Sequence, residues 1–119
     1  MIEQELNEIE MMEKANTNAQ IDLDMGLLLE KLHQNPEFQE IFLKGYLEKY
    51  ALRLIELKAH TGAQGERDQK FMGNQLDSIG HLKNYMGMIF EKARIAREKI
   101  NTNNEEILKA EKTMKDGRA

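Results

Sequence analysis

Residues 72–114 decide the fold, and they read MGNQLDSIGHLKNYMGMIFEKARIAREKINTNNEEILKAEKTM. Alternating steps of three and four residues from Met72 to Met114 visit thirteen positions, of which eleven are apolar. These positions, which we call the seam, are Met72, Gln75, Ile79, Leu82, Met86, Ile89, Ala93, Ala96, Ile100, Asn103, Ile107, Ala110 and Met114. Such spacing over six repeats is typical of a coiled coil. It predicts one helix over about 66–115, roughly 75 Å long at 1.5 Å per residue.

A second helix is predicted over 36–60, because Asn35 and Pro36 have the residue types of an N-cap and a first helical position. The apolar residues of this segment surround most of the helix, which predicts that several neighbours bury it. They include Phe38, Ile41, Phe42, Leu43, Leu47, Tyr50, Leu52, Leu54, Ile55 and Leu57.

A first helix is predicted over 18–33, with Thr17 as its cap and Gln20 completing a capping box. Residues 1–17 would precede it as an acidic arm. Residues 1–40 hold ten acids and two bases, whereas the remaining residues hold 11 acids and 15 bases. Opposite charges of this kind could attract within a chain or between chains, or the arm could simply be solvated.

The fold class predicted from these signals is all-α: an elongated helical hairpin or three-helix bundle with a long C-terminal coiled-coil-like helix. Residues 18–115 would form one helical domain, and 116–119 a flexible tail. A glycine-containing loop is predicted at 60–65, and a plain turn fits it better than a phosphate-binding loop, because it lacks the P-loop spacing and lysine.

The long helix also suggests self-association. The helix over 36–60 is about half its length, so it cannot cover the seam beyond Ala93 if it folds back from the loop. That part of the seam must be covered by the N-terminal segment, be covered by another subunit, or stay exposed. We therefore expect a homo-oligomer, another protein partner, or both.

Three glycines at seven-residue spacing, Gly73, Gly80 and Gly87, suggest that another helix approaches closely. Gly45 would lie near Leu82 in such a hairpin. The alternative is chance spacing on a solvent-facing surface. The predicted interaction residues are Ile79, Leu82, Met86, Ile89, Ala93, Ala96, Ile100, Ile107, Gly73, Gly80 and Gly87.

No pattern in the sequence indicates catalysis, a metal, a cofactor or a small-molecule substrate. Cysteine is absent, and no HExxH, P-loop or nucleotide fingerprint occurs. Each histidine follows an acid by three or four residues, which we interpret as surface contacts more readily than as a di-iron site. These pairs are Glu30 with His33, Glu56 with His60 and Asp77 with His81.

Composition argues against nucleic-acid and membrane partners. The net charge of −4 disfavours phosphate binding, although Lys92, Arg94, Arg97 and Lys99 cluster on the long helix. No apolar run approaches a membrane span and no signal peptide is visible, so a cytoplasmic location is expected.

Of eight methionines, Met72, Met86 and Met114 fall on the seam. Four others, Met11, Met12, Met25 and Met88, could mark an adaptable binding face.

The stretch KYALRLIELKA at 49–59, a glycine-containing break, and DSIGHLKNY at 77–85 together resemble small all-helical proteins of tailed phages. The resemblance covers about 45–97 and carries no catalytic motif. It implies a structural or virion-assembly role, in the host cytoplasm and the virion. Overall we expect a non-enzymatic structural or assembly protein. The alternative is a small regulator that binds a host protein through its acidic arm.

Overall fold

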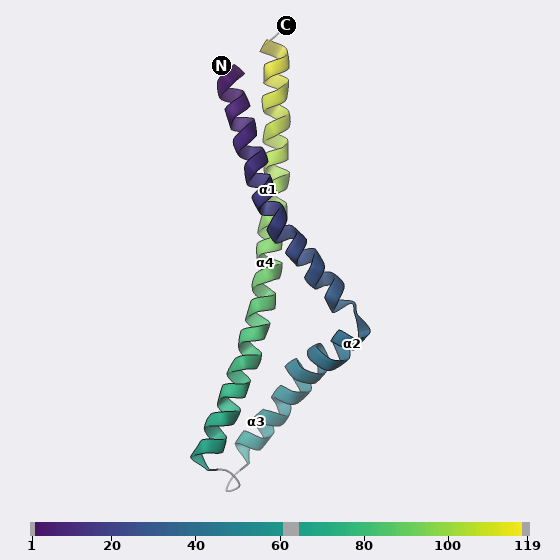
Figure 1. Cartoon of the computed structure of the whole chain (residues 1–119), viewed down its shortest axis with the longest axis vertical. Coiled ribbons are helices and arrows are strands. Elements are labelled where there is room, and N and C mark those ends of the chain that lie inside the picture. The colour runs from purple at the N-terminus through teal and green to yellow at the C-terminus, as the bar shows by residue number, and fades with distance from the viewer. Residues whose placement is uncertain (1, 61–64, 118–119) are drawn as a thin grey trace. The chain divides into compact units, whose positions relative to one another are not determined.

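In its described parts, residues 2–60 and 65–117, the computed structural model of the chain is entirely helical apart from short connections (Figure 1). The elements are α1 (Ile2–His33), α2 (Pro36–Phe38), the π-helical stretch η1 (Gln39–Tyr50), α3 (Ala51–Ala59) and α4 (Glu66–Gly117). The all-α class and the long C-terminal helix are confirmed. Most of the predicted loop at 60–65 and the last two residues of the predicted tail lie outside the described residues. None of the described helices is long and apolar enough to span a membrane.

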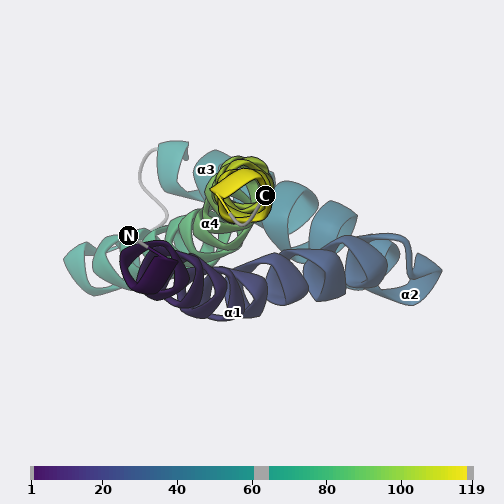
Figure 2. The same ribbon diagram turned by 90° about the horizontal axis from the view of Figure 1, so that it is seen from above.

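Two compact units make up the chain, and each contains part of both long helices. Unit 1 comprises Met1–Leu28 and Ile89–Ala119, and unit 2 comprises Leu29–Met88. Figure 2 shows the same helices along the long axis of Figure 1. That the whole of 18–115 forms a single domain stays a prediction.

Helix α1 corrects the prediction for the N-terminal region. It begins at Ile2 and runs without a break to His33, so the described residues 2–17 form no separate arm and no helix starts at 18. The Thr17 hydroxyl donates to the Glu13 carbonyl oxygen at 3.1 Å, which is a bond within the helix. The Gln20 side chain donates forward to Asp24 at 2.8 Å instead of reaching back to a cap. The residue types of a capping box are therefore present in a helix interior.

The break before α2 follows the prediction from Asn35 and Pro36. The backbone of Asn35 is extended, and its side-chain oxygen accepts a hydrogen bond from the Phe38 backbone N–H at 2.9 Å. This bond satisfies one of the donors that the first helical turn leaves unpaired. The side chain of Gln39 donates to the His33 carbonyl oxygen at 2.6 Å, and so connects the two helix ends.

Helix 36–59, formed by α2, η1 and α3, is covered along one side only. The covered row consists of Phe38, Gln39, Leu43, Leu47, Ala51, Leu54 and Leu57, and the nearby Gly45 and Tyr46 are also half-buried. Large apolar side chains on the other sides, among them Phe42, Leu52 and Ile55, are exposed, so the expectation that several neighbours bury this helix is wrong for the described chain. Within η1 the row advances by four residues, from Gln39 to Leu43 and from Leu43 to Leu47.

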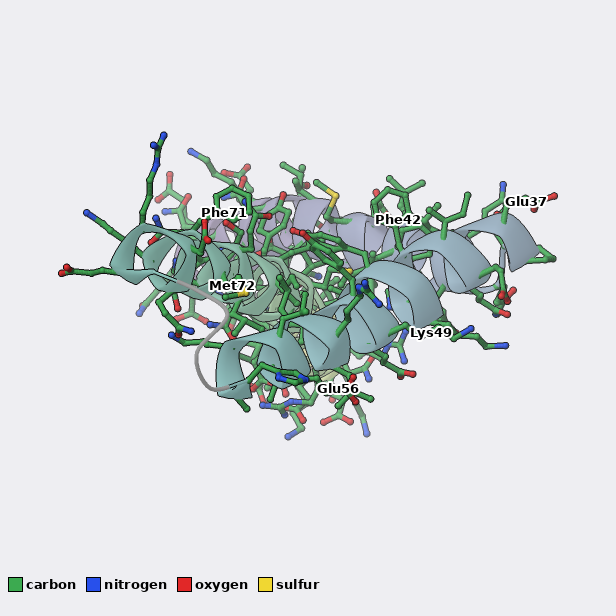
Figure 3. All side chains as sticks on the ribbon, turned by 90° about the horizontal axis from the view of Figure 1, so that it is seen from below. Glu37, Phe42, Lys49, Glu56, Phe71 and Met72 are labelled. Atoms are coloured by element: carbon green, nitrogen blue, oxygen red, sulfur yellow. The ribbon has the colours of Figure 1, made fainter. Side chains whose placement is uncertain are left out.

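Helix α3 and the start of α4 lie side by side in unit 2. Gln69 accepts a hydrogen bond from the Lys58 ammonium group at 3.1 Å and donates to the Lys58 carbonyl oxygen at 3.2 Å. Met72 is buried, whereas its neighbour Phe71 points outward and is exposed (Figure 3). Residues 66–88 of α4 thus present the seam to the rest of unit 2.

The seam is confirmed as the buried side of α4. All thirteen of its positions are buried or half-buried, with Ile79 the most covered at 2% exposure. Beyond Ile89 the neighbour is the N-terminal part of α1. Of the three alternatives for the distal seam, the structure therefore shows coverage by the N-terminal segment, and the length mismatch gives no reason to require a second subunit.

Candidate protein-interaction surface

Unit 1 is an antiparallel pair of helices that meet along two complementary rows. On α1 the row steps by three and four residues like the seam, and every member is buried or half-buried. Its members are Glu5, Ile9, Met12, Asn16, Ala19, Leu23 and Gly26. In Figure 1 this N-terminal part of α1 lies along the C-terminal part of α4. The pairing has the spacing of a two-stranded antiparallel coiled coil.

Two contacts determine the register of this pair. The Asn103 side chain donates to the Asn16 side-chain oxygen at 3.0 Å, and Gly26 lies against Ala93. Asn16 and Gly26 are ten residues apart, and so are Ala93 and Asn103, so the register is constant between the two contacts. Residues at the same level therefore have numbers that sum to 119.

Small side chains allow the two helices to approach closely. In this register Leu23 lies level with Ala96, and Ala19 lies level with Ile100. At Gly26 the approach is closest, because a Cβ atom built there would overlap the Ala93 Cβ. Gly26 is buried, and only glycine fits this position without a shift of one helix.

A polar layer crosses the middle of the pair. Besides the bond from Asn103, the Asn16 side chain donates to the Asn104 side-chain oxygen at 2.9 Å. A half-buried amide that needs an amide opposite it disfavours other registers, since a slip would leave its donors and acceptors unpaired. The layer thus specifies the pairing more than it stabilises it.

Within the described chain no helix packs against the three predicted glycines, so their approach by a helix of another molecule stays a prediction. A Cβ built on Gly73, Gly80 or Gly87 would meet no atom of another element within 4 Å in the described chain. Each of these glycines directly follows a seam residue, and adjacent helical residues do not share a face. Gly45 does not contact Leu82 either, because a Cβ there would meet only Glu40, at 3.0 Å from its carbonyl oxygen.

The remaining predicted interaction residues take part in packing within the chain. Ile79, Leu82 and Met86 are buried or half-buried in unit 2. The residues of unit 1 in this set are Ile89, Ala93, Ala96, Ile100 and Ile107, and all are buried or half-buried. That any of them also contacts a partner stays a prediction.

Unit 1 has an open groove along one side of the helix pair, which we call the groove face. One section has a volume of about 270 Å³ and is lined by Ala15, Asn18, Ala19, Asp22, Lys92, Ile95, Ala96 and Lys99. The next section has a volume of about 430 Å³ and is lined by Glu5, Glu8, Met11, Met12, Glu106, Lys109, Ala110 and Thr113. Residues seven apart stand in line along a coiled-coil helix, as Glu8, Ala15 and Asp22 do, so both sections belong to one side. Two of the methionines suspected of forming a binding face therefore lie together.

Charge divides the groove face along its length. The charged residues that α1 contributes are all acids: Glu5, Glu8 and Asp22. Those that α4 contributes are three bases and one acid: Lys92, Lys99, Lys109 and Glu106. Within the described residues the one ion pair among them joins Lys109 to Glu106 at 3.5 Å. The other charges therefore remain free to pair across an interface.

The basic cluster on α4 is not a continuous cationic patch. Arg94 bonds to Glu91 and also to Glu98, the latter at 2.9 Å, on the outer side of the helix. The hydrogen bond from Arg94 lowers the pKa of the Glu91 carboxyl below its ordinary value. Arg94 is thereby neutralised locally, while Lys92 and Lys99 belong to the groove face.

The histidines form no cluster with acids in the described part of the chain. No group of three or more His, Asp or Glu residues among residues 2–60 and 65–117 is arranged to hold a metal ion. His33 has its Nδ1 atom 2.9 Å from the Leu29 carbonyl oxygen and its ring 5.5 Å from that of Phe38. Its surroundings are those of a helix end.

Comparison with protein-family models, with curated proteins and with solved structures found no match to this chain.

Proposed function

We propose that this chain is a non-enzymatic structural or assembly protein that acts through helix–helix contacts with further copies of itself and with other proteins. The observation that supports this is the apolar surface that both units leave uncovered. Met11, Ile41 and Leu108 are 71%, 63% and 65% exposed, and they lie on three different helical segments. At least nineteen large apolar side chains are exposed in the described residues, and exposed apolar surface of this extent favours contacts with further helices. Further helices packed on these surfaces would remove them from water.

The alternative, a regulator that uses its acidic N-terminal residues as an arm, has less support. Residues 2–17 pair with α4, and Ile9 within them is buried. Binding a host protein through a free arm would require this pairing to open first. A surface-based assembly role needs no such step.

Self-association is tested by the native mass as a function of concentration. We expect sedimentation velocity or light scattering to give a mass above the 13.8 kDa of one chain, rising towards an integer multiple of it. A chain that remains a strict monomer at high concentration, with no partner added, would contradict self-association. Proline substitution within α4, at Ile100, is the control, because it breaks the helix and should abolish assembly.

We propose that this assembly takes place in a phage-infected cell, because residues 45–97 resemble small helical proteins of tailed phages. The protein should then be detected by mass spectrometry in purified particles or in assembly intermediates. Its absence from both would count against the virion role while leaving self-association unaffected.

A further inference from the structure

The groove face of unit 1 has a charge pattern that its own chain does not use. Its α1 edge is acidic, its α4 edge is mainly basic, and most of these charges have no ion-pair partner among the described residues. Between the edges lie small and apolar residues, including Ala15, Ala19 and Ile95. A matching surface would need a basic edge opposite α1 and an acidic edge opposite α4.

We infer that the groove face of unit 1 binds the groove face of a second copy of this chain. The two copies are related by a two-fold axis parallel to the helices, which makes the interface isologous. This arrangement places α1 of each copy against α4 of the other and forms a four-helix bundle. The inference rests on the proposed self-association and names the surface that carries it.

The register of the helix pair gives the expected charge pairs. Because the axis is parallel to the helices, levels are preserved between copies, and residues of α1 and α4 are level when their numbers sum to about 119. Glu8 is then level with a position two residues from Lys109, whose solvent-exposed ion pair with Glu106 it would share or replace. Asp22 is level with a position two residues from Lys99. Two residues are about 3 Å along a helix, within reach of a lysine side chain. Symmetry doubles these pairs to four.

A two-fold axis perpendicular to the helices does not place opposite charges against each other. It would set α1 against α1 and α4 against α4. The acids Glu8 and Asp22 would then face acids, and the lysines would face lysines, which is unfavourable. Among two-fold arrangements the parallel axis is therefore the one that the charges favour.

The size and composition of the groove face suit such a dimer. About 27 residues of each helix give a length of roughly 40 Å, and two adjacent helices give a width of roughly 20 Å. The product, about 800 Å² per copy, matches a standard stable interface. Met11 and Ile95, at 71% and 50% exposure, supply apolar contacts, and methionine adapts to an imperfect fit.

Charge reversal in two complementary variants tests the interface. One variant carries Glu8→Lys and Asp22→Lys, which makes both edges basic, and the other carries Lys99→Glu and Lys109→Glu, which makes both edges acidic. With four pairs, each worth about twofold to threefold in affinity, either variant alone should dimerise roughly 16-fold to 80-fold more weakly than the native chain. An equimolar mixture should regain native affinity, because the basic and acidic variants complement each other. Sedimentation equilibrium measures both quantities.

A matched control distinguishes the effect of charge reversal on the groove face from the effect of the changed net charge. Glu10→Lys with Asp24→Lys makes the same change in charge on the same helix but off the groove lining, and should leave dimerisation unchanged. Circular dichroism verifies that each variant is folded. If a reversed variant unfolds, Glu8→Gln with Asp22→Asn replaces it, with several-fold weaker dimerisation expected.

The outcomes distinguish this interface from self-association in general. If the native chain self-associates but the reversed or neutralised variants associate equally well, the groove face is not the interface, and the proposed function stands. A mixture that fails to recover also overturns the inference. A native chain that never associates overturns both.

Discussion

Replacing Gly26 with alanine is expected to lower the free energy of unfolding by about 1–2 kcal/mol. Alanine in a helix is intrinsically better than glycine by about 0.8–1 kcal/mol, so helix propensity alone predicts a gain. At this position, however, the new Cβ would overlap the Ala93 Cβ, and overpacking of this kind costs about 1–3 kcal/mol and can cost more. The steric term should exceed the propensity gain. Urea unfolding followed by circular dichroism, at one fixed protein concentration, measures the difference.

Two controls isolate the close contact. Gly80→Ala should raise the free energy of unfolding by about 0.5–1 kcal/mol, because no atom of another element lies within 4 Å of the added Cβ. Combining Gly26→Ala with Ala93→Gly restores the space, so the penalty at Gly26 should disappear in the double variant. If Gly26→Ala stabilises the chain as Gly80→Ala does, the register of unit 1 is wrong.

The long helix α4 could be predicted because its signal is local. Its apolar residues recur at intervals of three and four residues from Met72 to Met114. All thirteen seam positions are buried or half-buried in the structure. The start of α2 was also local, since Asn35 and Pro36 determine it through their own backbone and side chain. Neither feature depends on which distant segment packs against it.

The partner of the distal seam could not be identified in the same way. The row on α1 follows the same steps, but Glu5, Asn16 and Gly26 interrupt its apolar pattern. Their roles are evident only once the opposite helix is known: Asn16 needs Asn103, and Gly26 needs Ala93. The residues Thr17 and Gln20 added a false helix start, because the same types are compatible with a helix interior.

The packing partner of helix 36–59 could not be predicted from its sequence either. Apolar residues all around a helix predict burial on every side, yet the structure covers one row. Which row is covered depends on the neighbour and on the wide turns of η1. A pattern of apolar residues therefore indicates which surfaces need a partner, but not whether that partner belongs to the same chain.

Substitutions at Leu54 and Ile55 test which side of helix 36–59 is buried within one chain. Both are branched aliphatic residues of the same size, adjacent on α3, but Leu54 is 3% exposed and Ile55 is 53% exposed. Leu54→Ala should lower the free energy of unfolding by about 2–4 kcal/mol, since it removes buried methyl groups and leaves a cavity. Ile55→Ala should change it by no more than about 0.5 kcal/mol, as is usual for surface substitutions. The same urea titration serves both variants.

The dependence of the unfolding free energy on protein concentration distinguishes the covered row from the exposed side of helix 36–59. At concentrations where the chain is monomeric, only Leu54→Ala should be destabilising. Assembly stabilises the folded state by mass action, so an effect of Ile55→Ala that emerges only as the chain associates would assign the exposed side of α3 to a contact between molecules. An equal loss for both variants in the monomer would instead mean that helix 36–59 is buried on several sides within one chain, and would contradict the one-sided packing of unit 2.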